Sequence, residues 1–266
     1  MYEKFFEMQN TPFINAIPVE ALYLSEKHME ILGRLQYAAE GSRFAVLTAR
    51  VGVGKSTLIR KFAQTLCPDK YTVLYLSDSQ LTPRWFYKGL LDQLGIEAKF
   101  YRGDAKRQLH KQLKVIRDIH HRKVCVIIDE SHLLDREALE EVRFVLNSNM
   151  DSANPMSLTL VGQNELWDKL RMQLYAAIRD RIDIKCELLG MDRAELEGYV
   201  NAHLKYAGGK DEIFTETAID ELFRYSAGSA RAVNKAATHC LLYAAQRAKK
   251  MIDDTMVRTV IEAELP

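Results

Sequence analysis

The sequence predicts an α/β protein, a three-layer sandwich around a parallel five-stranded sheet, followed by a small C-terminal helical subdomain. The first observation is that short, almost continuously apolar runs alternate with longer helical stretches up to residue 188. Strands that helices cover on both faces have this character, and such strands pair in parallel. The second observation is that only helical periodicity remains after residue 188.

Five apolar segments are predicted as strands. They cover residues 43–48, 71–77, 124–129, 157–162 and, with a weaker pattern, 182–188. Four helices are then predicted within 190–209, 214–228, 229–250 and 253–265. Asp192 and Glu195 have the spacing of a capping box at the start of the first of these helices, and Gly208 and Gly209 end it.

These elements divide the chain into three expected parts. Residues 1–42 form an N-terminal segment that packs on the core, residues 43–188 form the α/β core, and residues 189–266 form the helical subdomain. A chain of 266 residues is long enough for one large domain with a small companion.

Composition excludes several classes of protein. With 47% hydrophobic and 27% charged residues, the chain has the make-up of an ordinary folded protein and not of a disordered one. The four cysteines, at 67, 125, 186 and 240, include no C-x-x-C pair, which argues against zinc, redox or disulfide frameworks. No segment approaches the roughly 18 apolar residues of a membrane span. We therefore expect a cytoplasmic protein without a membrane partner.

The segment "TARVGVGKST", residues 48–57, nearly matches the phosphate-binding loop G-x-x-x-x-G-K-[ST]. It lies between a predicted strand and an amphipathic helix, which is the setting that this loop requires. The glycines allow backbone N–H groups to close around phosphate, the lysine can reach the β and γ phosphates, and the serine can bind Mg²⁺. The predicted nucleotide ligands are Gly52, Val53, Gly54, Lys55, Ser56 and Thr57.

Ala49 stands where the motif has its first glycine. A positive φ at this position would cost about 1 to 3 kcal/mol in strain. Because known phosphate loops accept alanine here, we expect nucleotide binding to survive, although Ala49 and Arg50 could slow turnover.

A second, independent signal is "VCVIIDESH", an apolar strand that ends in two carboxylates. In this pattern Asp129 supports Mg²⁺, together with Ser56, and Glu130 polarises the water that attacks the γ phosphate. An oriented base distinguishes a hydrolase from a simple nucleotide binder. The sequence therefore predicts Mg²⁺-dependent ATP hydrolysis.

Seven strings in this order resemble the AAA+ ATPases, and more narrowly the ExeA-type group. This group includes secretion ATPases and ATPase partners of DNA transposases, with TnsC, TniB and MuB as broader relatives. The matching strings are "MYEKFFEMQNTPF", "LYLSEKHMEILGRLQYA", "VGVGKSTLIR", "VIIDESHLL", "LTLVGQNEL", "RDRIDIKCEL" and "YSAGSARAVNKA". The resemblance implies a P-loop NTPase sandwich with an AAA+ core and a helical lid.

The resemblance also implies roles for four further positions. Gln163 is expected to be the polar sensor of the γ phosphate or of the attacking water, and Tyr23 to line the adenine pocket. Arg181, or Arg179 in its place, is expected to reach the ATP of a neighbouring subunit as an arginine finger. Arg231 is expected to be the sensor arginine of the lid. An arginine finger requires self-assembly, as a ring or a helical oligomer.

Residues 84–123 are strongly basic, with eleven Lys and Arg against four Asp and Glu. On a helical wheel, Leu109, Leu113 and Ile116 share one face, and the cations project from the other. One interpretation is a solvated helix face, and the other is contact with DNA phosphates. For the second, the candidates are Lys99, Arg102, Arg107, Lys111 and Lys114, with Arg84 and Lys88 on the preceding helix.

Two functions of different classes follow. The first is a regulator that assembles on duplex DNA with ATP, without strong sequence preference, and controls DNA transposition through a transposase-like partner. The second is a secretion-type assembly ATPase, and a nucleotide-gated signalling switch is a further alternative. Secretion relatives carry a membrane span and an envelope-binding region after the ATPase, which this sequence lacks, so we expect the first function.

Overall fold

The computed structural model describes residues 2–77, 81–146, 154–209 and 213–265, and the chain forms two compact units. The α/β unit comprises Lys27–Arg50 and Lys55–Leu188. The helical unit comprises Met1–Glu26, Val51–Gly54 and Leu189–Pro266. Among the described residues, no helix combines the length and the apolar character needed to cross a membrane.

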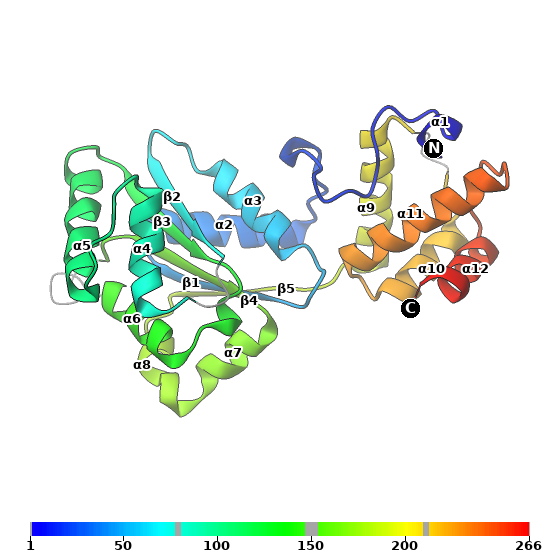
Figure 1. The fold of residues 1–266 in the computed structure, drawn as a ribbon. Coiled ribbons are helices and arrows are strands. Elements are labelled where there is room, and N and C mark those ends of the chain that lie inside the picture. The colour runs from blue at the N-terminus through cyan, green and yellow to red at the C-terminus, as the bar shows by residue number, and fades with distance from the viewer. Residues whose placement is uncertain (1, 78–80, 147–153, 210–212, 266) are drawn as a thin grey trace. The chain divides into compact units, whose positions relative to one another are not determined.

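The α/β unit contains a five-stranded sheet in which every neighbouring pair of strands is parallel (Figure 1). The strands are β1 (Phe44–Ala49), β2 (Tyr71–Leu76), β3 (Lys123–Ile128), β4 (Ser157–Gly162) and β5 (Ile184–Leu188). Their order across the sheet is β2-β3-β4-β1-β5. All five predicted strands are therefore present, and the predicted fold class is confirmed.

Helices lie on both faces of this sheet, as Figure 1 shows. They are α2 (Glu26–Glu40), α3 (Lys55–Thr65), α4 (Pro83–Gln93), α5 (Arg102–Asp118), α6 (Arg136–Leu146), α7 (Asn164–Arg171) and α8 (Ala176–Arg179). Two 3₁₀ turns, η2 (Ser131–Leu133) and η3 (Gln173–Tyr175), precede α6 and α8. The central strands β1 and β4 are buried along their whole length because both of their faces are covered.

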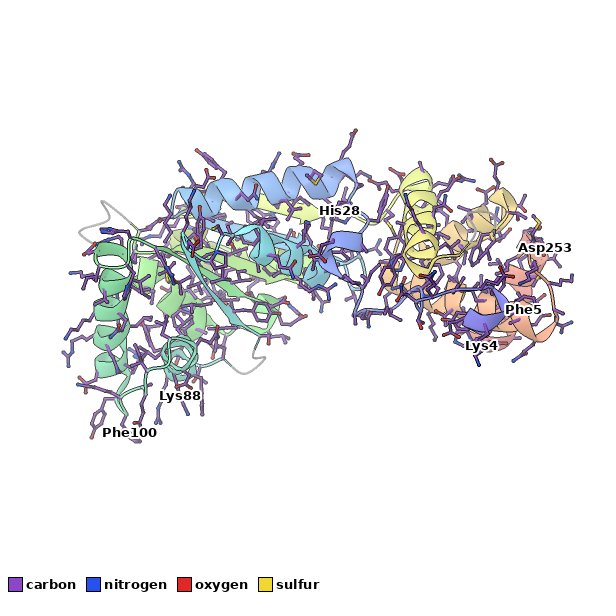
Figure 2. The ribbon with its side chains drawn as sticks, turned by 90° about the horizontal axis from the view of Figure 1, so that it is seen from above. Lys4, Phe5, His28, Lys88, Phe100 and Asp253 are labelled. Atoms are coloured by element: carbon purple, nitrogen blue, oxygen red, sulfur yellow. The ribbon has the colours of Figure 1, made fainter. Side chains whose placement is uncertain are left out.

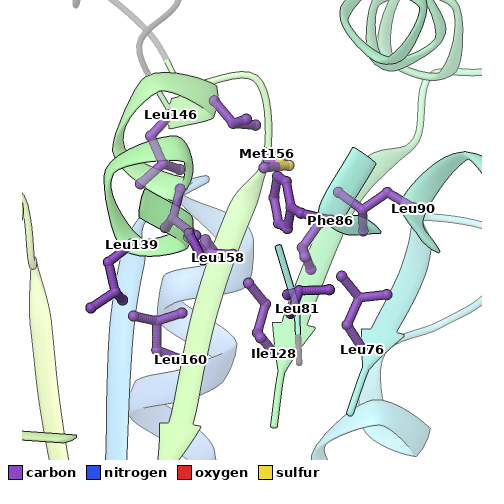
Figure 3. Packing of buried hydrophobic residues seen from close by; sticks show 14 of the residues in the cluster. Leu76, Leu81, Phe86, Leu90, Ile128, Leu139, Leu146, Met156, Leu158 and Leu160 are labelled. Carbon is purple, nitrogen blue, oxygen red and sulfur yellow. The ribbon is translucent and has the colours of Figure 1, made fainter. Parts of the chain in front are cut away.

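The main core of the α/β unit lies between the sheet and α4 to α8. Alternate residues of β1 to β4 enter it, because successive side chains of a strand point to opposite faces. Figure 3 shows Ile128, Leu158 and Leu160 from the strands against Phe86 and Leu139 from the helices. This packing fixes the ends of β3 and β4, where the site residues begin.

The helical unit consists of α9 (Arg193–Ala207), α10 (Glu216–Ser226), α11 (Ala230–Gln246) and α12 (Asp254–Glu264), with α1 (Tyr2–Phe5) and the 3₁₀ turn η1 (Val19–Ala21) from the N-terminus. The predicted capping box is present, since Asp192 and Glu195 each bond the other's backbone N–H. Gly208 ends α9 in the left-handed conformation, with φ 75°. Each of the four predicted helices is found.

The N-terminal segment differs from the expectation that residues 1–42 pack together on the core. Met1–Glu26 belongs to the helical unit, whereas most of α2 belongs to the α/β unit. Tyr2, Phe6 and Phe13 are buried in the core of the helical unit, and the N–H of Gln9 donates to Ala207 O at 2.7 Å. Figure 2 labels Phe5, whose ring lies 4.2 Å from Lys250 Nζ in the same unit.

Candidate active site

The phosphate-binding loop follows β1 and leads into α3. Gly52 and Gly54 have positive φ, 80° and 104°, which is the conformation that glycine adopts without strain. Ala49 does not share it: it is the last residue of β1, fully buried and opposite Leu188. The strain considered for Ala49 therefore does not arise.

Lys55 is the first residue of α3, and its side chain points to the end of β3. The side chain is only 10% exposed, and Nζ lies 3.9 Å from Glu130 Oε1. Ser56 and Thr57 follow in the first turn of α3, where Ser56 is exposed and Thr57 half-buried. Val53 is buried. The lysine predicted to bind phosphate and the carboxylate predicted to act as base therefore converge.

Asp129 follows β3 directly and is 3% exposed. Its Oδ1 accepts a hydrogen bond from the N–H of Glu130 at 2.8 Å, and its Oδ2 accepts one from the Tyr75 hydroxyl at 2.8 Å. Burial, followed by the bond to Asp129, raises the pKa of Tyr75, so the phenol stays protonated and acts as a donor. Among the described residues, no Lys or Arg forms a salt bridge with Asp129.

This arrangement fits a divalent cation. A buried carboxylate is stable only when it is paired or bound to metal, and the hydrogen bonds leave the charge of Asp129 without a cationic partner. No group of three or more His, Cys, Asp or Glu that could enclose a metal occurs in the described ranges. Mg²⁺ in nucleotide sites needs no such cage, because it takes few protein ligands and several from phosphates and water.

Glu130 has a left-handed backbone, with φ 52° and ψ 29°. This conformation is uncommon for a residue with a side chain, and such outliers concentrate at functional sites. The carboxylate is 40% exposed and lies between Lys55 Nζ and His132 Nδ1, at 3.9 and 3.4 Å. The predicted base is therefore accessible and bordered by two nitrogen donors.

Gln163 follows β4 and precedes α7. Its Nε2 lies 2.9 Å from Nε2 of His132, so the predicted sensor and the η2 turn are in direct contact. Neither His132 nor Tyr75 was predicted as a site residue. His132 was within the quoted string "VIIDESHLL", but its contact with Gln163 depends on the pairing of β3 with β4, which places Ile128 opposite Leu160.

Both candidates for the arginine finger are bound within their own chain. Arg181 Nη1 donates to Arg143 O at 3.3 Å, and Arg179 Nη1 donates to Arg171 O at 2.9 Å. Each guanidinium therefore has a similar backbone partner. The choice between the two residues stays a prediction.

The two remaining predicted nucleotide contacts belong to the helical unit. Arg231 is exposed near the start of α11, and its N–H donates to Gly52 O at 2.9 Å, within that unit. Tyr23 contacts α9, where its ring lies edge-on to Tyr199 with centroids 6.3 Å apart. A Cβ at Gly198 would come within 2.7 Å of the Tyr23 ring, so the ring needs the small residue there.

The basic helix α5 has the predicted amphipathic form. Leu109, Leu113 and Ile116 are buried, whereas Lys111 and Lys114 are exposed. Of the other predicted DNA contacts, Lys99 is exposed, Arg102 lies 3.7 Å from Glu141, and Arg107 pairs with Asp104. Lys111 and Lys114 form no salt bridge with any residue that the structure describes.

Comparisons with known proteins agree with this geometry. The AAA domain family matches residues 38–170. The general secretion pathway protein A of Aeromonas hydrophila is 31% identical over 259 residues, which are 95% of this chain and 46% of that protein. This chain thus spans less than half the length of that relative.

Solved structures share the fold. Drosophila ORC bound to DNA has a TM-score of 0.70 at 18% identity, covering 98% of this chain and 64% of that one. The Aeropyrum pernix ORC2 protein has a TM-score of 0.65 at 17% identity, over 98% and 71% of the two chains. The Thermotoga maritima RuvB branch migration motor has 0.61 at 17%, over 90% and 69%. With the resemblance to the AAA+ ATPases thus confirmed, the chain belongs to the AAA domain family and is an ATPase.

Proposed function

We propose that this ATPase hydrolyses ATP with Mg²⁺ and uses Glu130 as the general base. The observation that carries the proposal is the convergence of Lys55 and Glu130, whose charged atoms lie 3.9 Å apart beside the phosphate loop. In this assignment Lys55, with the backbone N–H groups of Gly52 to Ser56, binds the β and γ phosphates. Glu130 then takes a proton from the water that attacks the γ phosphate.

Mg²⁺, when bound, would neutralise the charge that develops on the phosphate oxygens. Asp129 and Ser56 would hold it, and the Tyr75 hydroxyl fixes the orientation of the Asp129 carboxylate. Gln163 would contact the γ phosphate or the attacking water. Arg231, Tyr23 and one of the two candidate arginine fingers are assigned here from the family resemblance, and a finger that acts on a neighbouring subunit implies self-assembly. The cytoplasmic location is part of the proposal.

For the cellular process, we favour the secretion-type assembly ATPase. The relative that matches 95% of this chain is a general secretion pathway protein, so the secretion alternative has better support than the expected role in transposition. The position at which the chain ends carries no weight against this alternative, because the chain spans only 46% of its relative.

DNA association is a second candidate, and a specific surface favours it. Phe100 and Tyr101 are about 70% exposed before α5, with the Arg84 guanidinium 4.4 Å from the Phe100 ring. Lys88 and Phe100 are labelled at the same end of the α/β unit in Figure 2. Cations beside exposed aromatic rings suit a nucleic-acid backbone and its bases, and Lys111 and Lys114 extend the positive charge along α5.

One assay separates the two candidates. ATP turnover is measured with and without duplex DNA at low and high salt, for the wild type and for the charge reversal Lys111→Glu with Lys114→Glu. The secretion proposal predicts that neither DNA nor charge reversal changes turnover. Stimulation by DNA that disappears with salt and with the charge reversal would overturn that proposal and support DNA association.

The secretion proposal also has a direct test. The corresponding segment of the Aeromonas hydrophila relative is replaced by this chain, and protein secretion is measured, with the Glu130→Gln chimaera as the matched control. We expect secretion with the wild-type segment only. A chimaera that is produced and hydrolyses ATP but does not secrete would count against the proposal.

A further inference from the structure

His132 connects two parts of the site that the family resemblance treats separately. Its imidazole lies between Gln163, at 2.9 Å from Nε2, and Glu130, at 3.4 Å from Nδ1. The side chain is only 11% exposed, so water does not compete freely for either nitrogen. The predicted sensor, the imidazole and the predicted base therefore form a continuous chain of polar groups.

The contact with Gln163 sets the direction of these hydrogen bonds. An amide nitrogen only donates, so Gln163 Nε2 requires a lone pair on Nε2 of His132. The proton of the neutral imidazole is then on Nδ1, the nitrogen that faces Glu130 Oε2. Gln163 thus selects the tautomer that presents a donor to the base.

The donor on Nδ1 lacks a full hydrogen bond. Nδ1 is buried and has no hydrogen-bond partner among the described residues, and the Glu130 carboxylate at 3.4 Å is slightly beyond ordinary range. A buried polar group normally has a partner, and those without one often mark functional positions. A small rotation of the Glu130 side chain would complete the bond.

The backbone around His132 is firmly held. Lys169 Nζ donates to the carbonyls of His132 and Leu134, at 2.8 and 2.9 Å. Ser131 Oγ donates to Ile128 O at 2.6 Å. At Gly162 a Cβ would lie 3.1 Å from His132 N, so β4 passes close to η2 at this glycine. The imidazole is therefore presented from a rigid turn.

We propose that His132 is a positioning residue that orients Glu130 for hydrolysis and links this orientation to Gln163. Lys55 and His132 each face one oxygen of the carboxylate. Once Lys55 engages phosphate, the Nδ1–H of His132 is the group that keeps Glu130 in place. When Gln163 turns to the γ phosphate, its hydrogen bond to His132 changes. The imidazole then couples the presence of the γ phosphate to the orientation of Glu130. This inference depends on the proposed role of Glu130.

Three substitutions test it, because asparagine and glutamine each reproduce one nitrogen of the imidazole. His132→Asn places an amide near the position of Nδ1 and can donate to Glu130. His132→Gln reaches the position of Nε2 and loses that donor, and His132→Phe keeps the ring shape without either nitrogen. We expect kcat to fall between about tenfold and a hundredfold for Gln and Phe, much less for Asn, with KM for ATP nearly unchanged.

Equal kcat in all three variants and the wild type would overturn the proposal. Equal losses of kcat in all three variants, accompanied by a lower melting temperature or weaker ATP binding, would also overturn the proposal, because they indicate a structural role.

A double-mutant cycle separates this proposal from the assignment of Glu130. In a Glu130→Gln background, His132→Phe is expected to cost nothing further, because the group that it positions is already gone. If Glu130→Gln alone leaves turnover intact, the proposed function fails. If Glu130→Gln abolishes turnover while His132→Phe in the wild-type background does not lower it, only the role of His132 fails.

Discussion

Acid should destabilise the helical unit through His203. This residue is 2% exposed on α9, and its ring is stacked on Phe13 with centroids 5.2 Å apart. The N–H of Phe13 donates to His203 Nδ1 at 3.0 Å, so the imidazole must be neutral to accept this bond. Burial lowers the pKa of His203 to about 4.

The pH range and the magnitude follow from this pKa. The ordinary value for histidine is about 6.5, and above it the residue is neutral in both folded and unfolded chains. Below that pH the unfolded chain binds a proton that the folded chain does not, so stability falls with pH until the folded pKa is passed near 4. A difference of roughly 2.5 pH units corresponds to about 3 kcal/mol, of which about 2 kcal/mol appear between pH 7 and 4.5.

The assay is urea unfolding followed by circular dichroism at pH 7 and 4.5, for the wild type and for His203→Asn. The asparagine oxygen can accept from the N–H of Phe13 but does not titrate, and carboxylates contribute equally to both proteins. We expect the wild type to lose about 2 kcal/mol more than the variant over this range. If the wild type and the variant lost the same unfolding free energy over this pH range, the reasoning would be refuted, because His203 would then titrate alike in the folded and unfolded chains.

Two further predictions concern a tight turn and the metal site. Gly228→Ala should destabilise the helical unit by about 2 kcal/mol or more, since φ is +80° and the new Cβ would lie 2.2 Å from Met191 O. The control in urea unfolding is Gly103→Ala, whose added Cβ meets nothing within 4 Å. A free energy of unfolding for Gly228→Ala equal to that of this control would contradict the prediction. Tyr75→Phe removes the donor to Asp129 and should raise the Mg²⁺ concentration for half-maximal turnover severalfold, which a Mg²⁺ titration of turnover measures; an unchanged Mg²⁺ dependence would contradict it.

The central strands β1, β3 and β4 could be predicted from the sequence because they are buried on both faces. Val126 and Ile128 pack against α4 to α8, and their neighbours Cys125 and Ile127 are equally buried. An unbroken apolar run is the direct result. The N-terminal segment could not be placed in the same way, because Phe6 and Phe13 follow no helical or strand period and reach α9 and its neighbours only through tertiary packing.

The candidate site could also be predicted only in part from the sequence. Lys55, Asp129 and Glu130 were found because their spacing within short strings is fixed by local backbone geometry. His132 and Tyr75 act across strands, and each contact depends on which strands are neighbours. Tyr75 on β2 reaches Asp129 after β3, and His132 after β3 reaches Gln163 after β4. Strand order was not predicted, so neither contact could be.

The central claim is that Glu130 is the base of an ATP-hydrolysing site. It is tested most directly by ATP binding and steady-state turnover of the wild type and of Glu130→Gln, measured with Mg²⁺. The account predicts that the variant binds ATP about as tightly as the wild type while its turnover falls about 100-fold or more. Turnover in Glu130→Gln equal to that of the wild type would contradict the account, because hydrolysis would then proceed without this carboxylate.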